Sequence, residues 1–176
     1  MKRISILFLW MLITLVVRSE SPVEVPKALR SELKKILQTE DYILSRLDVS
    51  TKSAINGSYY VISGPKTERV RYVYSGRVNT RRSNHPGSAG SDFFDYFIFY
   101  TSNVVIEKVK IIRYQSSHGG GITSPGWLKQ FRGYDGRKLL VVGKNVDAIS
   151  GATISVNNLA FDIQSKTQIL LSHVSD

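Results

Sequence analysis

The sequence predicts an α+β fold in which a mainly antiparallel sheet is flanked by an N-terminal and a C-terminal helix. Apolar residues recur at helical spacing near both ends of the chain. Between these two segments lie short runs rich in β-branched and aromatic residues, separated by turn signals. Because several of these runs follow one another without a regular alternation of strands and helices, the pattern favours antiparallel pairing.

The first 19 residues are expected to be a signal peptide or an N-terminal anchor. Lys2 and Arg3 precede a run without charged residues from Ile4 to Val17. As a helix this run would reach about 21 Å, less than the ~30 Å hydrocarbon core of a bilayer, so cleavage after Ser19 is favoured over a spanning helix. Either alternative places the protein outside the cytoplasm, in the periplasm or elsewhere in the cell envelope.

Residues 20–58 are expected to form an N-terminal helical segment, followed by a domain over residues 59–176. Apolar positions within residues 26–47 fall at helical offsets. They predict one helix, or two helices with a break near Thr39 and Glu40.

The elements predicted after this segment follow from local patterns of apolar, β-branched and turn-forming residues. In chain order they are strands at 59–62 and 70–74, a loop at 79–91, a hairpin with strands at 93–100 and 104–114, a glycine-rich loop at 119–126, a strand at 138–142 and a helix that includes 156–171. The strand at 93–100 is apolar on both faces and should be covered on both sides. In the next strand, Lys108 and Lys110 should face outward.

The composition describes a basic domain without cysteine. The chain has 176 residues, of which 42% are hydrophobic, and a formal net charge of +10. The hydrophobic fraction excludes intrinsic disorder, and the absence of cysteine excludes disulfide scaffolds and thiolate metal sites. Because the basic residues are scattered in short groups, we expect a solvated basic surface and no nucleic-acid partner. Attraction to anionic headgroups or to acidic redox partners is an open alternative.

No catalytic residue and no metal site are assigned from the sequence. His85, His118 and His173 lie far apart and lack the spacing of metal ligands. His118 and the three glycines after it are similar to an oxyanion loop, but the chain contains no G-x-S-x-G nucleophile motif. It also contains no P-loop and no G-x-G-x-x-G dinucleotide motif.

The segment with the clearest chemical meaning is Asp147 to Ser155, which reads DAISGATIS and precedes the last predicted helix. Backbone N–H groups at a helix N-terminus attract phosphate, and Gly151 and Ala152 let a ligand approach the backbone closely. Ordinary helix capping by the hydroxyls of Ser150, Thr153 or Ser155 is the alternative.

This segment resembles the D-x-x-S-G-A-T-x-[ST] signature of the FMN-binding domain family, found in flavin subunits of the Na⁺-translocating quinone reductase and Rnf complexes. The similarity runs from the hairpin at 93–114 through the last helix, whereas the chain up to about Gly90 gives no specific match. It is strongest to small stand-alone exported members, and we expect residues 59–176 to be the FMN-binding domain. It implies FMN in phosphoester linkage to Thr153, donated from FAD by a flavin transferase that uses magnesium. It also implies cofactor contacts from the rest of the motif, namely Asp147, Ser150, Gly151, Ala152 and Ser155.

His118 and Trp127 occupy the place where family members carry a loop against the flavin. Trp127 is expected to stack on the ring system, with a core tryptophan as the alternative. His118 is either a loop histidine bonded to the backbone or a proton donor. The Ser124–Gly126 stretch lacks the glutamate that the complex subunits carry before T-P-G.

We therefore expect an exported electron carrier rather than a stand-alone enzyme, although a flavin reductase would show the same residues. Its partners would be the flavin transferase and redox proteins at the membrane. Two alternatives are open: a module that binds or senses FMN without a covalent bond, and an envelope surface-interaction domain without flavin.

Overall fold

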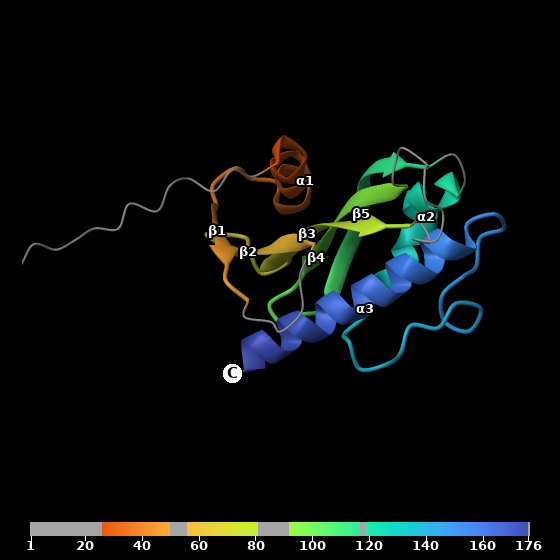
Figure 1. Ribbon diagram of the computed structural model, residues 1–176. Coiled ribbons are helices and arrows are strands. Elements are labelled where there is room, and N and C mark those ends of the chain that lie inside the picture. The colour runs from red at the N-terminus through yellow and green to blue at the C-terminus, as the bar shows by residue number, and fades with distance from the viewer. Residues whose placement is uncertain (1–25, 50–55, 81–91, 117–118, 176) are drawn as a thin grey trace, which may run out of the picture.

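Helices cover both faces of an antiparallel sheet (Figure 1). The computed structural model of the chain describes residues 26–49, 56–80, 92–116 and 119–175. The N-terminal helix α1 packs on one face of the sheet, and the C-terminal helix α3 packs on the other. The prediction of an α+β fold with an antiparallel sheet between an N-terminal and a C-terminal helix is therefore confirmed.

The strands of the sheet lie side by side in the order in which they follow in the chain. Each strand pairs antiparallel with the next, so the sheet is a meander. The bounds of the main elements are α1 (Lys27–Leu37), β1 (Ile43–Leu47), β2 (Gly57–Ser63), β3 (Tyr72–Asn79), β4 (Phe93–Tyr100), β5 (Ile106–Gln115) and α3 (Thr153–Ser175).

β4 contributes to the apolar core on both faces of the sheet. Phe94, Tyr96 and Ile98 lie in the core cluster under α3, whereas Phe97 and Phe99 lie in the cluster under α1. All five side chains are fully buried. Successive side chains of a strand point to opposite faces, so the run of aromatic residues in β4 fits a strand covered on both sides, as predicted.

α1 closes its face of the sheet with an apolar stripe. Leu29, Leu33 and Leu37 lie about one helical turn apart and are buried. They pack against a cluster made of Val70, which precedes β3, and the sheet residues Tyr60, Ile62, Val73, Phe97 and Phe99. Burial of each leucine contributes about 1.5–3 kcal/mol, so this packing is the main attachment of α1.

A buried carboxylate, Glu32, also ties α1 to β5. It accepts hydrogen bonds from Lys35 Nζ at 3.0 Å and Lys108 Nζ at 2.9 Å, and Lys110 Nζ lies 3.7 Å away. Burial alone would raise the pKa of Glu32, but the hydrogen bonds from Lys108 and Lys35 and the charges of Lys108 and Lys110 lower it to about 2. As predicted, Lys108 and Lys110 stand on the face of β5 opposite the buried Val109 and Ile111, and their side chains are 39% and 38% exposed although both ammonium groups lie close to Glu32.

α3 is attached to the opposite face by apolar residues along most of its length. Its side chains Val156, Leu159, Ile163 and Leu170 are fully buried in the core cluster that contains Phe94, Tyr96, Ile98 and Tyr100. The beginning of the helix is further connected to the end of β3, because Asn158 Nδ2 donates to the carbonyl of Asn79 at 3.2 Å. The first turn of α3 therefore lies at the end of the sheet where β3 ends and β4 begins.

Tyrosine hydroxyls set the rotation of α3 about its axis. Tyr59 donates to the Lys166 carbonyl at 2.8 Å, Tyr96 donates to the Asp162 carboxylate, and the Tyr100 hydroxyl lies 3.2 Å from Thr167 Oγ1. Burial raises the pKa of all three tyrosines well above its ordinary value, so the hydroxyls stay neutral at physiological pH. Buried hydroxyls need partners, so these bonds favour one seating of the helix.

The prediction of helix over residues 26–47 is correct only for the first half. α1 ends at Leu37, since Gln38 takes a left-handed conformation with φ 55°. Residues 43–47 are strand β1, which pairs with β2. The apolar residues Ile43, Leu44 and Leu47 fit a short strand as well as a helix, and the strand gains the backbone bonds that β2 offers.

The strand predicted at 138–142 is also wrong. Within this stretch the described structure has only an isolated bridge between Val142 and Val146. Side chains bind the backbone groups that a neighbouring strand would bind: Asn145 contacts Val141 N and the Leu139 carbonyl, and the Leu140 N–H donates to Gln164 Oε1 at 2.9 Å. Satisfied backbone groups do not need a sheet partner.

Two of the predicted segments lie wholly or mostly outside the described residues. The signal peptide or anchor over residues 1–19 is one, and most of the loop at 79–91 is the other. Among the described helices, none has the length and apolar character needed to cross a bilayer.

The ion cluster around Glu32 predicts how stability depends on acid pH. The pKa of Glu32 is about 2 in the folded chain against an ordinary value of 4.5, so its contribution is complete above pH 4.5 and is lost as the pH falls toward 2. Glu32→Gln should lower the free energy of unfolding at pH 7 by up to about 3 kcal/mol. Urea unfolding at pH 7 and at pH 3 measures both effects.

The matched control is Glu40→Gln, which removes an exposed ion pair with Lys34. It should leave the stability almost unchanged at both pH values. Equal losses in the two variants would contradict the role given to Glu32.

Candidate functional site

The segment Asp147–Ser155 forms the junction between an irregular stretch and α3. The helix begins at Thr153, and the Ala152 N–H donates to the Ile149 carbonyl at 3.0 Å, so the chain turns tightly before it. Gly151 has φ +75° within this turn, a conformation that favours glycine. The first N–H groups of a helix have no partner within it, and they point along the helix axis with a partial positive charge.

The hydroxyl side chains of this junction lie in different surroundings. Ser155 is buried, and its Oγ lies 3.3 Å from the Tyr114 hydroxyl. Ser150 and Thr153 are exposed. Within the described ranges the structure records no hydrogen bond for the side-chain hydroxyl of either residue, so neither acts there as a helix cap. Thr153 therefore presents its hydroxyl to solvent on the first residue of α3.

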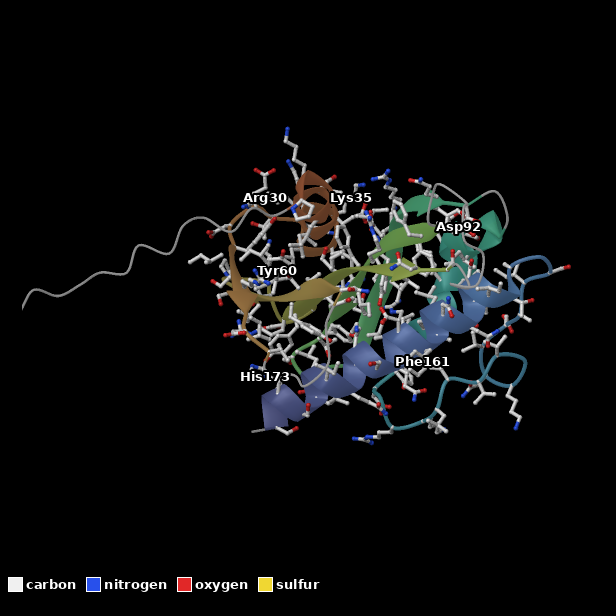
Figure 2. All side chains as sticks on the ribbon, in the orientation of Figure 1. Arg30, Lys35, Tyr60, Asp92, Phe161 and His173 are labelled. Carbon is white, nitrogen blue, oxygen red and sulfur yellow. The ribbon has the colours of Figure 1, made fainter. Side chains whose placement is uncertain are left out.

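A hollow of about 370 Å³ lies beside Thr153. Its described lining consists of residues 151–155 together with Thr80, Asp92 and Ser116, which stand at the ends of β3, β4 and β5. The Thr80 N–H donates to the Asp92 carbonyl at 2.8 Å, and Ser116 Oγ donates to Asp92 Oδ2 at 3.2 Å. The volume lies in the range of small-molecule sites. Figure 2 labels Asp92 near the beginning of α3.

The glycine-rich loop passes against the same junction. A Cβ added to Gly119 would lie 2.9 Å from the Tyr114 hydroxyl and 3.1 Å from the Ala152 Cβ, and one added to Gly121 would lie 3.1 Å from Ile149 Cγ2. Such contacts require glycine at Gly119, whose φ is +80°. Most of the stretch that was expected to be a loop, residues 119–126, consists of short helices in the structure, namely η1 (Gly120–Thr123) and the beginning of α2 (Pro125–Leu128). The fold thus brings the loop and the junction together.

Trp127, on α2, contacts the first residue of the junction. Its Nε1 donates to the Asp147 carbonyl at 3.0 Å, and the Asp147 N–H donates to Gln130 Oε1 at 2.7 Å. The indole is half-buried, packs edge-on against Phe131 with ring centroids 5.4 Å apart, and is not part of the described lining beside Thr153. The structure therefore brings Trp127 together with Asp147 and not with Thr153. His118 lies outside the described residues.

Thr80, Asp92 and Ser116 were not predicted as site residues. Each stands just beyond the end of a strand, and nothing in its local sequence marks it. The pairing register places the ends of these strands side by side, since Asn79 pairs with Phe93 and Phe93 pairs with Gln115. Only a correct strand register could have found these residues from the sequence.

The residues of the hollow fit a phosphate group on the α3 side. The first turn of α3 offers backbone N–H donors, and a Cβ added to Gly151 would meet no atom within 4 Å. Asp92 is the only charged residue in the described lining, and its carboxylate would repel a phosphate placed close to it. An anion is therefore favoured at Thr153 and disfavoured at Asp92. Within the described ranges, no group of three or more His, Asp or Glu side chains could hold a metal ion.

No protein-family model and no curated protein sequence matches the chain. The resemblance to the FMN-binding domain family therefore depends on the residues quoted for it, above all on residues 147–155.

The contact between the glycine-rich loop and the junction predicts unequal effects of two neighbouring substitutions. Gly119→Ala places a methyl group against Tyr114 and Ala152 at a positive φ, so the free energy of unfolding should fall by about 1–2 kcal/mol. Gly120→Ala meets no atom within 4 Å and should change it by less than about 0.5 kcal/mol. Thermal unfolding of the two purified variants tests this difference, and a similar loss in both would contradict the packing described here.

Proposed function

We propose that this protein is an exported flavoprotein that carries FMN in phosphoester linkage to Thr153 and acts as an electron carrier. The observation that carries the proposal is the placement of Thr153. Its hydroxyl is exposed on the first residue of a 23-residue helix, beside a hollow of about 370 Å³. This placement suits the residue that the sequence resemblance marks as the attachment point.

The other hydroxyls of the junction are less suited to attachment. Ser155 is buried and bonded to Tyr114, so a transferase would have to displace it from the core. Ser150 is exposed, but it does not line the hollow. Thr153 alone among these three combines exposure with a position on the hollow.

Thr153 would act as the acceptor in a group transfer. Its Oγ would form a bond to the FMN phosphorus of FAD while the pyrophosphate bond breaks, AMP leaves and the hydroxyl proton passes to a base of the flavin transferase. The N–H groups of the first turn of α3 would donate to the phosphate oxygens, and their partial positive charge would stabilise the phosphate in place. Gly151, which lacks a side chain, keeps this approach open.

FMN, when bound, supplies one- or two-electron transfer, and the fold sets its environment. The described lining of the hollow offers hydroxyls, backbone groups and the single carboxylate of Asp92. These groups do not form the acid–base pair or the nucleophile and base that substrate chemistry needs. A carrier that exchanges electrons with redox proteins at the membrane is therefore favoured over a stand-alone enzyme.

Covalent attachment also fits the expected location outside the cytoplasm. A covalent bond prevents loss of the cofactor where free FMN is scarce. The partners that we propose are the flavin transferase, which attaches the cofactor, and redox proteins at the membrane. We propose no nucleic-acid partner.

The proposal predicts that flavin attachment depends on Thr153. The chain is co-expressed with a flavin transferase in an exporting bacterial host, and a denaturing gel is examined for flavin fluorescence. Thr153→Ala should abolish the fluorescent band, because it removes the acceptor oxygen, and Thr153→Ser should keep part of it. Thr123→Ala removes another exposed hydroxyl, one that does not line the hollow, and should leave the band unchanged.

The alternatives give different results in this experiment. A non-covalent FMN site predicts a dark band for every variant and only a modest loss of affinity in Thr153→Ala, of about 1 kcal/mol for one hydrogen bond. An envelope surface-interaction domain predicts no flavin at all. A dark wild-type band with an active transferase, verified on a control substrate, would overturn the covalent proposal.

A further inference from the structure

A basic cleft lies on the face of the sheet that carries α1, away from the hollow beside Thr153. It has a volume of about 470 Å³ and runs between α1, the first half of β5 and the helices α2 and η2 (Lys129–Phe131). The described residues of its wall include six that are cationic, namely Lys35, Arg69, Lys108, Lys110, Lys129 and Arg132. It shares no described lining residue with the hollow.

Positive charge exceeds negative charge in this cleft. Glu107 is the acidic residue of the described lining. The buried Glu32 is not part of the lining, but its carboxylate is paired with Lys108 and Lys110, which are. Two carboxylates against six cations leave four positive charges that are not neutralised within the cleft. Grouping cations in a concave site is unfavourable by itself, and an anion bound there would offset the repulsion.

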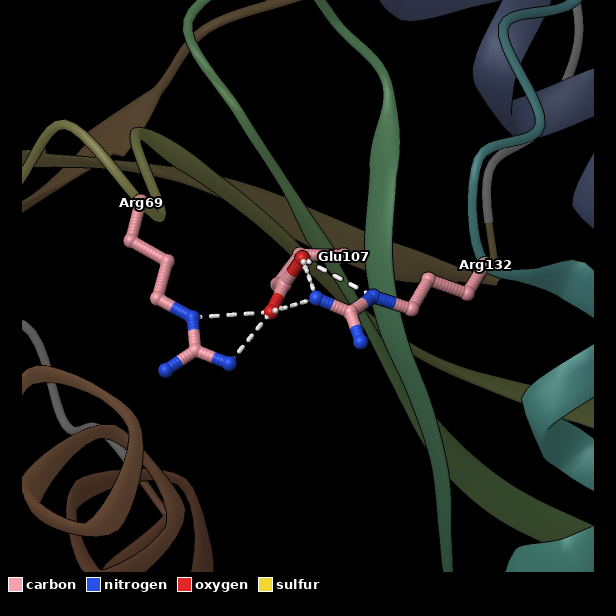
Figure 3. A network of polar contacts seen from close by, with 3 residues as sticks. All are labelled: Arg69, Glu107 and Arg132. Carbon is pink, nitrogen blue, oxygen red and sulfur yellow. Dashed lines mark hydrogen bonds and ion pairs between the residues drawn. The ribbon is translucent and has the colours of Figure 1, made fainter.

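Glu107 holds two guanidinium groups in the wall of the cleft (Figure 3). Arg69 binds Glu107 Oε1 through Nε at 2.8 Å and through Nη2 at 2.7 Å. Arg132 reaches the same carboxylate through Nη2, which lies 3.1 Å from both oxygens. A guanidinium has five N–H donors in a rigid fork, so each arginine keeps donors that Glu107 does not use. Glu107 therefore orients the two arginines without using up their binding capacity.

Glu32 orients three lysines in the same way. Lys35, Lys108 and Lys110 all lie within 3.7 Å of its carboxylate. An ammonium group has three donors, and Glu32 has only two oxygens, so most of these donors stay free for a ligand. Side chains held in place lose less conformational entropy when they bind, which favours binding by this cleft over binding by scattered surface lysines.

Apolar residues complete the wall. Ile36 of α1 is half-buried, and Pro125 and Leu128 of α2 stand on the other side of the cleft. Small-molecule sites combine such apolar surface with a few placed polar groups. The wall therefore fits a ligand that joins an anionic group to an organic body better than it fits a bare inorganic ion.

We propose that the basic cleft binds a phosphate-bearing organic ligand, with its phosphate on the arginine and lysine cluster and its organic body against Ile36, Pro125 and Leu128. Arginine forks match phosphate oxygens in pairs, and lysines add point charges. The ligand is either a free phosphorylated molecule or the headgroup of an anionic lipid. This site is independent of the proposed flavin attachment at Thr153.

The experiment uses 1-naphthyl phosphate as the free probe and vesicles of phosphatidylglycerol, with phosphatidylcholine as the neutral comparison. Binding of the free probe is measured by titration calorimetry, and vesicle binding is measured by sedimentation. The variant is Lys129→Glu, because Lys129 lines the cleft but makes no ion pair within the described ranges, so its replacement spares the Glu32 and Glu107 networks. The control is Lys138→Glu, an exposed residue with the same change of charge outside the cleft.

Lys129→Glu should weaken binding at least tenfold, while Lys138→Glu should weaken it less than twofold. Loss of naphthyl phosphate binding supports a free ligand, and loss of phosphatidylglycerol binding alone supports a lipid headgroup. Equal weakening by the two variants would show attraction to overall charge and would overturn the proposal. So would failure of the wild-type chain to bind either probe at 0.05 M salt, a concentration at which charge attraction is only partly screened.

Discussion

The seating of α3 on the sheet determines where the candidate site forms. Apolar residues along α3 bury it against the core that includes β4, and the hydroxyls of Tyr59, Tyr96 and Tyr100 contact three successive polar groups within residues 162–167 of the helix. This arrangement carries the first turn of α3 to the ends of β3, β4 and β5. The exposed hydroxyl of Thr153 and the hollow beside it are consequences of that contact.

The two faces of the sheet differ in chemistry because different helices cover them. On the α3 face, apolar side chains and neutral tyrosine hydroxyls pack against the helix together with the Lys166–Asp162 ion pair, and the backbone N–H groups at the beginning of α3 carry a partial positive charge. On the α1 face, Glu32 and Glu107 gather lysines and arginines into a cleft. The two sites proposed for phosphate therefore differ in origin, since one depends on backbone dipoles and the other on side-chain charges.

Local features of the fold could be predicted from the sequence, and long-range ones could not. The aromatic run of β4, the hairpin to β5 and the start of α3 are encoded by neighbouring residues. Residues 43–47 fit a helix as well as a strand, because a short apolar pattern is compatible with both periods, and the structure has a strand there. The strand predicted at 138–142 is absent from the described structure, because Asn145 binds backbone groups that a neighbouring strand would have bound. Thr80, Asp92 and Ser116 meet only through strand register, and Glu32 finds Lys108 across 76 residues.

The central claim is that Thr153 carries the flavin, and peptide mass mapping tests it most directly. After co-expression with a flavin transferase, trypsin should release the peptide of residues 145–166, which contains the whole junction after Lys144. The account predicts a mass raised by FMN less water, with fragment ions that place the addition on Thr153. An unmodified peptide, or an addition on Ser150 or Ser155, would contradict it.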